Sequence, residues 1–237
     1  MKKTALYTAL ALSLGMSALS AQAATLNNGD TLSITAGVPV LNANGTAVKN
    51  MLGSYFGMDT NGNSAIAPTE KTALSQGTTG LVIGTTTSPG ASHGGCPAAG
   101  DTNAIDAPWC FFGNTGSDFL KVAATGGTSG VNLSGWTVTW NNIPAINMGG
   151  GAWGTGFSNG VGNLVWDGVY GDAYTLDYHA TVPPGDVSGF GLVKYALHLE
   201  GTVKAAPVSG VPIPAAAWLL GSGLVGLVGV ARRKTQA

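Results

Sequence analysis

Two stretches near the end of the chain alternate between apolar and polar residues. From 174 to 182 the apolar positions are Tyr174, Leu176, Tyr178, Ala180 and Val182, and threonine, aspartate and histidine occupy the positions between them. From 193 to 203 the apolar face is Val193, Tyr195, Leu197, Leu199 and Val203, opposite Lys194, His198, Glu200 and Thr202. Because successive side chains of a strand point to opposite faces, this period of two predicts two strands, each with one covered and one solvated face.

Shorter segments follow the same pattern. Trp136, Val138 and Trp140 alternate with threonines, and residues 31–34 form a further candidate strand. Residues 163–170 precede a Gly-Asp turn and are predicted to pair with the 174–182 strand as a hairpin. Spaced strands with Gly, Pro and Asn between them predict a mainly β fold, an antiparallel β-sandwich.

One segment has a different period. Its apolar residues are Val48, Met51, Leu52, Tyr55 and Phe56, which recur at helical spacing. We therefore expect a short helix here, although the intervening glycine weakens it.

The next twelve residues, 59–70, match the spacing of an EF-hand calcium loop. Asp59, Asn61 and Asn63 place side-chain oxygens at positions 1, 3 and 5, Ala65 offers its carbonyl at position 7, and Glu70 stands at position 12. Calcium takes six to eight hard oxygen ligands, so this spacing predicts a weak structural Ca²⁺ site within a short helix-loop-helix.

The loop also departs from that pattern. Position 6, which is normally glycine, is Ser64, and only two of the side-chain ligands are charged. An ordinary turn rich in Asn, Gly and Asp explains the same residues. Both interpretations stay open at this point.

Composition and charge narrow the function classes. The chain of 237 residues contains 38 Gly, and 9% of its residues are charged. Between the two ends lie five lysines, no arginine and all 11 acidic residues, which gives that part a net charge of −6. This balance excludes a basic surface for nucleic acid, and it suits cations, neutral glycans or other proteins.

The N-terminus has the features of a secretory signal peptide. Lys2 and Lys3 precede an apolar run, and Ala21 and Ala23 form a small-x-small cleavage pattern. We expect residues 1–23 to be removed by the export machinery; an N-terminal membrane anchor is the alternative. Cys96 and Cys110 are expected to form a disulfide in an oxidising compartment, worth about 3 kcal/mol for a loop of this length.

Candidate reactive groups are few. Asp177 and His179 share one strand face, as do His198 and Glu200, so neighbouring strands would allow a His₂-carboxylate metal site. Solvated polar faces explain the same alternation. The motifs of serine hydrolases, zinc peptidases and phosphate-binding loops do not occur. We therefore expect no enzymatic activity; a hydrolase with an undetected acid/base pair is the competing hypothesis.

Aromatic residues suggest another function. If Trp109, Trp136 or Trp153 were exposed, their rings could stack on sugars, whereas tryptophan in β-proteins more often belongs to the core. A glycan-binding module is therefore a second functional hypothesis.

The C-terminus is apolar and then basic. Residues 213–231 are apolar or small, which is long enough for one transmembrane helix. Arg232, Arg233 and Lys234 would keep its end in the cytoplasm, so the domain before it would face the periplasm from the inner membrane.

This tail resembles the PEP-CTERM sorting signal in its VPLPA form. The resemblance covers about 24 residues: the motif, the apolar helix and the basic end in the expected order. The motif consists of Val211, Pro212, Ile213, Pro214 and Ala215, with Ile213 in place of the usual Leu. The resemblance implies that an exosortase cuts the precursor near the motif and that the product moves to the cell surface or an exopolysaccharide matrix.

The sequence thus predicts three parts: a signal peptide (1–23), a β-rich exported domain (24–207) and a sorting signal (208–237). The expected function is that of a non-enzymatic surface or biofilm-matrix protein associated with exopolysaccharide. The alternative is a glycan-binding module of that matrix.

Overall fold

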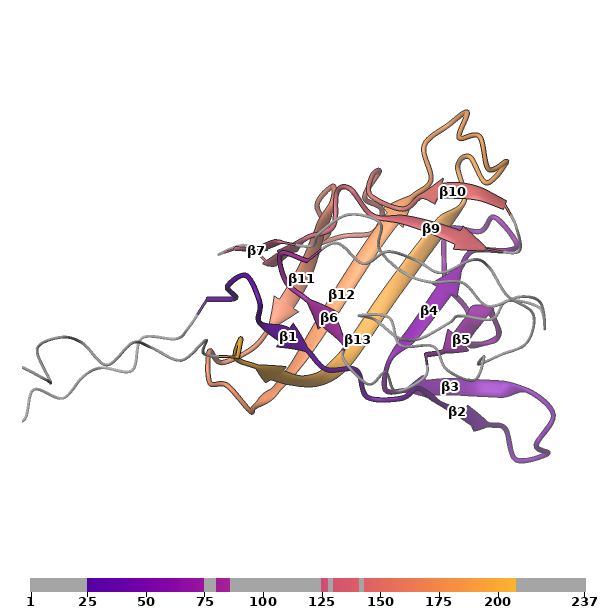
Figure 1. The fold of residues 1–237 in the computed structure, drawn as a ribbon. Coiled ribbons are helices and arrows are strands. Elements are labelled where there is room, and N and C mark those ends of the chain that lie inside the picture. Colours follow the sequence, from indigo (N-terminus) through magenta and orange to yellow (C-terminus); the bar gives the residue numbers. More distant parts are fainter. Residues whose placement is uncertain (1–24, 75–79, 86–124, 128–129, 141–142, 208–237) are drawn as a thin grey trace, which may run out of the picture.

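The computed structural model describes residues 25–74, 80–85, 125–127, 130–140 and 143–207 (Figure 1). Within these ranges the chain forms strands and one 3-10 helix, η1. Their bounds are β1 Thr31–Leu32, β2 Val38–Leu41, β3 Val48–Leu52, β4 Tyr55–Met58, η1 Pro68–Glu70, β5 Lys71–Ala73, β6 Leu81–Val82, β7 Thr125–Gly127, β8 Gly130–Asn132, β9 Thr137–Trp140, β10 Ile143–Asn147, β11 Val161–Val165, β12 Ala173–Thr181 and β13 Lys194–Lys204.

The two alternating stretches form the centre of the main sheet. The strand order is β5-β4-β13-β12-β11-β8-β7, all antiparallel, and β1 pairs with both the end of β13 and β6. β12 and β13 pair continuously from Ala173↔Thr202 to Thr181↔Lys194. β13 therefore lies between β12 and β4 and organises the sheet.

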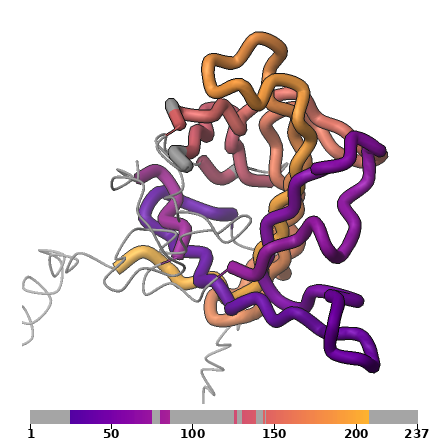
Figure 2. Tube along the Cα trace, turned by 90° about the vertical axis from the view of Figure 1, so that its right-hand side faces the viewer, coloured from indigo at the N-terminus to yellow at the C-terminus, as the bar shows by residue number. Residues whose placement is uncertain are grey.

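Further strands cover one face of the long strands. The β9–β10 hairpin crosses one half of β12 and β13, and β1 and β6 cross the other half (Figure 1). Figure 2 shows these segments on one side of the long strands and residues 38–74 toward the other. Gly201 permits the β1 crossing, because a side chain there would overlap the Ser33 carbonyl oxygen.

The core lies between these layers and is rich in aromatic side chains. Trp136, Tyr174, Tyr178 and Tyr195 are each at most 2% exposed. The Tyr178 hydroxyl donates to the Met148 carbonyl at 2.9 Å, and the Tyr195 hydroxyl donates to the same oxygen. Pairing of the buried hydroxyls removes the cost of burying them, so the core holds both layers together.

The expected mainly β, antiparallel architecture is confirmed. Every predicted apolar position from 174 to 182 is at most 2% exposed, and the positions between them are half-buried. The predicted hairpin is also present, since β11 pairs with β12 at Asn163↔Asp177 and Leu164↔Leu176.

The helix expected at residues 48–56, and with it the helix-loop-helix, is wrong. This segment forms β3 and β4, separated by Gly53 at φ +67°, where a side chain would overlap the Ala36 carbonyl oxygen. The apolar residues that suggested a helix belong to two different sheets. Phe56 lies in β4 and faces the core, whereas Leu52 lies in the β2–β3 hairpin and is 55% exposed. After the loop, Pro68–Glu70 forms only η1 and leads into β5.

Nowhere in the described ranges does a helix reach the length and apolar character required to cross a bilayer. The predicted transmembrane segment, 213–231, lies outside those ranges.

Candidate functional site

The loop predicted to bind calcium connects β4 to β5 at one edge of the main sheet. It begins beside the start of β13, where the Asp59 amide donates to the Lys194 carbonyl at 2.8 Å. It ends at η1, which carries Glu70. Two antiparallel strands thus fix both ends of the loop, in place of the two helices of an EF-hand.

Asp59 organises the first half of this loop from a buried position. Its side chain is 8% exposed, and its carboxylate accepts the Asn63 amide at 3.1 Å and the Ser64 amide at 2.8 Å. Asn61 and Asn63 add two Asx-type turns, because each side-chain oxygen accepts the amide two residues on, at 3.0 and 2.9 Å. The side-chain oxygens of positions 1, 3 and 5 are therefore all directed back onto the loop.

Ser64 has a left-handed backbone, with φ +64°. This is position 6, where EF-hand loops require glycine for a sharp turn. A side chain at such φ costs free energy, and here the serine hydroxyl gains a partner because the Lys194 ammonium donates to it at 2.6 Å.

Glu70 closes the loop from its far end. Its Oε1 accepts the amide and the hydroxyl of Thr60 at 2.8 and 2.7 Å and the Asn61 amide at 3.3 Å, and its Oε2 accepts the Ala67 amide at 2.9 Å. The hydrogen bond from the Thr60 hydroxyl is the largest cause of the lowered pKa of Glu70. The carboxylate is therefore kept ionised, the form that binds a cation.

The donor set fits calcium in its chemistry. The two carboxylates of Asp59 and Glu70, two side-chain amide oxygens and the Ala65 carbonyl are hard oxygen ligands, and the two acidic residues supply the formal negative charge. The Lys194 ammonium on Ser64 opposes a cation and would weaken its binding. Across the described parts of the chain, no group of three or more His, Cys, Asp or Glu side chains is placed to hold a metal ion.

A second polar cluster lies on the outer face of β12 and β13. Asp177 and His198 are direct cross-strand partners, and His198 Nδ1 lies 2.6 Å from Asp177 Oδ1 while Nε2 lies 3.0 Å from Glu200 Oε1. The Tyr55 ring stacks on the imidazole at 5.1 Å. The hydrogen bond to Asp177 contributes most to raising the pKa of His198.

This geometry does not form the metal site drawn from the sequence. Both ring nitrogens of His198 already face carboxylates, which lie on opposite sides of the ring and cannot share one ion with it. His179 is directly opposite Ala196 and stacks against Trp153 at 4.4 Å and Phe157 at 3.7 Å. Burial among these rings lowers the pKa of His179. The solvated-face interpretation of this alternation describes the cluster better.

The end of the domain opposite the 59–70 loop is held by Asp30, which is 2% exposed. Its Oδ2 accepts the Asn27 amide at 2.7 Å and the Tyr170 hydroxyl at 3.0 Å, and its Oδ1 accepts the Ala206 amide at 2.8 Å. One carboxylate thus joins the first described residues, the β11–β12 turn and the last described residues.

Sequence reasoning missed Asp30, Tyr170 and Lys194. Asp30 stands in an Asn-Gly-Asp turn before β1, which is a signal for a turn but not for a partner 176 positions away. Lys194 reaches Ser64 across 130 positions. Only the pairing of β13 with β4 brings that lysine to the loop.

The remaining predicted residues fall into two groups. Trp136 is 1% exposed, so its ring belongs to the core and is not available to a sugar, and Trp153 is half-buried with its indole N–H on the Ala180 and Tyr195 carbonyls. The other predicted residues lie outside the described ranges: Trp109, Ala21, Ala23, Cys96, Cys110, the motif at 211–215 and the basic residues at 232–234.

Comparisons with protein-family models, with curated proteins and with solved structures found no match to this chain.

Proposed function

We propose that this protein is an exported, exosortase-processed cell-surface or matrix protein that associates with exopolysaccharide and has no enzymatic activity. The precursor is tethered in the inner membrane by residues 213–231 and faces the periplasm. The C-terminal signal, from the motif at 211–215 to the basic end, carries this proposal.

The placement of the domain's ends supports a tether. Residues 25–30 and 203–207 lie side by side, because β1 pairs with the end of β13 and Asp30 accepts the Ala206 amide. Figure 1 shows both ends of the described chain at the same pole. The 59–70 loop and the β12–β13 loop lie at the other ends of the long strands, away from a tethering membrane. The two packed layers support the interpretation of the exported domain as a sandwich.

The processing step has a direct test. Mass spectrometry of the exported protein, from cells with and without exosortase, should show that the segment from Trp218 to Lys234 is absent only when the enzyme is present. An exported form that keeps this segment in exosortase-containing cells would contradict the processing step.

We further propose that the 59–70 loop binds calcium weakly and stabilises the exported domain. The left-handed Ser64 backbone at the position where such loops need glycine is the observation that favours it. Asp59 and Glu70 would carry the charge, Asn61, Asn63 and the Ala65 carbonyl would complete the shell, and water would fill gaps.

A further inference from the structure

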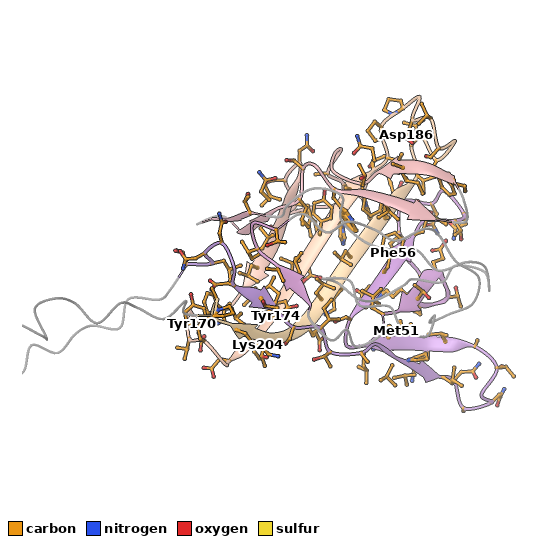
Figure 3. The ribbon with its side chains drawn as sticks, in the orientation of Figure 1. Met51, Phe56, Tyr170, Tyr174, Asp186 and Lys204 are labelled. Atoms are coloured by element: carbon orange, nitrogen blue, oxygen red, sulfur yellow. The ribbon has the colours of Figure 1, made fainter. Side chains whose placement is uncertain are left out.

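Exposed large apolar residues of the described chain gather in three places. Val38, Leu41 and Leu52 lie on the β2–β3 hairpin, Val187 and Leu192 lie in the β12–β13 loop, and the third group is Val165, Val169 and Tyr170. The third group surrounds the turn from β11 to β12. We call residues 165–172 the proximal turn, because it lies at the pole where the described chain begins and ends (Figure 3).

The proximal turn presents an apolar and aromatic surface. Val165 is 70% exposed, Val169 is 51% exposed and Tyr170 is 39% exposed. The Trp166 ring packs at 5.5 Å from the Tyr170 ring, and its indole N–H donates to the Val169 carbonyl at 2.9 Å. Trp and Tyr rings combine an apolar body with a polar edge, the combination enriched where proteins meet the bilayer interface.

The turn is fixed to the point from which the tail departs. The Tyr170 hydroxyl and the Ala206 amide bind the same Asp30 carboxylate, and the Gly171 amide donates to the Val203 carbonyl at 2.7 Å. Ile213, the first residue of the predicted span, lies seven positions after Ala206, so the connection is at most about 25 Å long. A tethered domain therefore keeps this turn within reach of the headgroups.

Charge identifies the kind of lipid surface. Asp167 and Asp172 are both exposed in this turn, and a hydrogen bond with Asp167 raises the pKa of Asp172. Acidic side chains are repelled by anionic lipid, so the turn is suited to a zwitterionic surface and to apolar rather than electrostatic contact.

We propose that the proximal turn is a membrane-contact surface that lies against the headgroup region of a zwitterionic bilayer while the tail tethers the chain. This inference rests on the proposed tether. It adds a second contact that fixes the orientation of the domain, with the 59–70 loop directed away from the membrane.

The test uses the full chain in phosphatidylcholine nanodiscs whose lipids carry a quencher of tryptophan fluorescence near the headgroup. The part of the quenching that Trp218→Phe removes from the parent chain reports insertion of the tail. In a Trp218→Phe background, Trp166→Phe should lower the remaining lipid-dependent quenching at least twofold. The matched control, Trp153→Phe, should leave that quenching unchanged, because Trp153 packs on the outer face beside His179.

A second pair of variants does not depend on tryptophan. Val165→Asp should abolish quenching of Trp166, whereas Val187→Asp, at the most exposed apolar residue of the β12–β13 loop, should not. Adding phosphatidylglycerol should reduce quenching of Trp166. Near-ultraviolet circular dichroism checks that each variant keeps its fold.

The outcomes separate the two proposals. Quenching of Trp218 with no quenching of Trp166 means that the tail inserts and the turn does not touch lipid, which overturns the membrane contact alone. An unquenched Trp218 overturns the tether and the contact together. If Val165→Asp changes self-association and leaves quenching intact, the surface belongs to a second copy of the chain and the membrane contact is wrong.

Discussion

Asp30 and Asp59 are buried at opposite ends of β13. Both accept hydrogen bonds through their carboxylates, but they have different structural roles. Asp30 accepts hydrogen bonds from Asn27, Tyr170 and Ala206, which lie up to 176 positions away. Asp59 accepts the amides of Asn63 and Ser64, which lie four and five positions on. Asp30 therefore connects distant parts of the fold, whereas Asp59 shapes one loop.

This difference determines whether each carboxylate mainly supports the stability of the whole fold or can take part in binding an ion. The Asp30 carboxylate is occupied by donors that the whole fold positions, so losing it affects global stability. The donors on Asp59 are amides of a single loop and its companion ligands are local, so the loop can adjust around an ion without disturbing the sheet. The following predictions test this contrast, from the largest effect to the smallest.

Replacing Asp30 should have the largest effect. Asp30→Ala removes three hydrogen bonds that a buried carboxylate accepts from separate parts of the chain, which should lower the free energy of unfolding by about 3 kcal/mol. Urea denaturation followed by circular dichroism measures it. Asp167→Ala, at an exposed aspartate of the proximal turn, should change stability by less than about 0.5 kcal/mol. Equal effects of the two variants would refute the role of Asp30 as a connection.

Calcium should stabilise the protein by binding to the 59–70 loop, at the end of β13 opposite Asp30. An ion that binds only the folded state raises the free energy of unfolding by about 2.7 kcal/mol at about 100 times the dissociation constant. Melting curves with millimolar calcium and with chelator should therefore separate, and Glu70→Gln should largely remove the separation. Superimposable curves, with no heat of binding in calorimetry, would reduce the loop to an ordinary turn.

Two substitutions of Ser64 separate the effect of its left-handed backbone on stability and calcium affinity from the effect of its hydroxyl. Ser64→Gly relieves the left-handed strain, so we expect it to raise both stability, by about 1 kcal/mol, and calcium affinity. Ser64→Ala keeps the strain and loses only the contact with Lys194. Thermal melts and calcium titrations of both variants give the comparison; a more stable alanine variant than glycine variant contradicts the strain.

The smallest effect is the pH dependence from the two histidines between these ends. Because folding raises the pKa of His198, this histidine adds to the free energy of unfolding. The contribution is fully present below about pH 6.5 and is lost as pH rises through the folded-state pKa. The lowered pKa of His179 has the opposite effect on the free energy of unfolding. Its contribution is fully present above about pH 6.5 and is lost as pH falls through the folded-state pKa.

Both shifts together predict a shallow stability maximum near the ordinary histidine pKa. Denaturation across this pH range should show that His198→Gln removes the decline on the alkaline side and His179→Gln removes the decline on the acid side. A profile that either variant leaves unchanged would remove that histidine from the explanation.

The sequence predicted the parts of the fold in which local pattern and tertiary role agree. β12 alternates along its whole length and β13 along most of it, because one face of each strand covers the core, so the period of two was enough to identify both strands. Residues 48–58 failed because the chain changes sheets at Gly53, and two short strands with different faces produced an apparent helical period. The spacing of oxygen-bearing residues in the 59–70 loop could be recognised from the sequence. The contacts of Lys194 and Asp30 depend on the pairing of distant strands, which no local pattern encodes.

The position of β13 also has a mechanical consequence. The predicted tail continues from the end of this strand, which is held by β12 over its length, by β4 near its start and by β1 at its end. If the proposed tail anchors the domain, drag would be transmitted to the C-terminal end of β13, and the component of this force along the strand is perpendicular to the interstrand hydrogen bonds. Those bonds are then loaded together in shear, and the domain resists unfolding under tension better than it would if the strand peeled away one bond at a time.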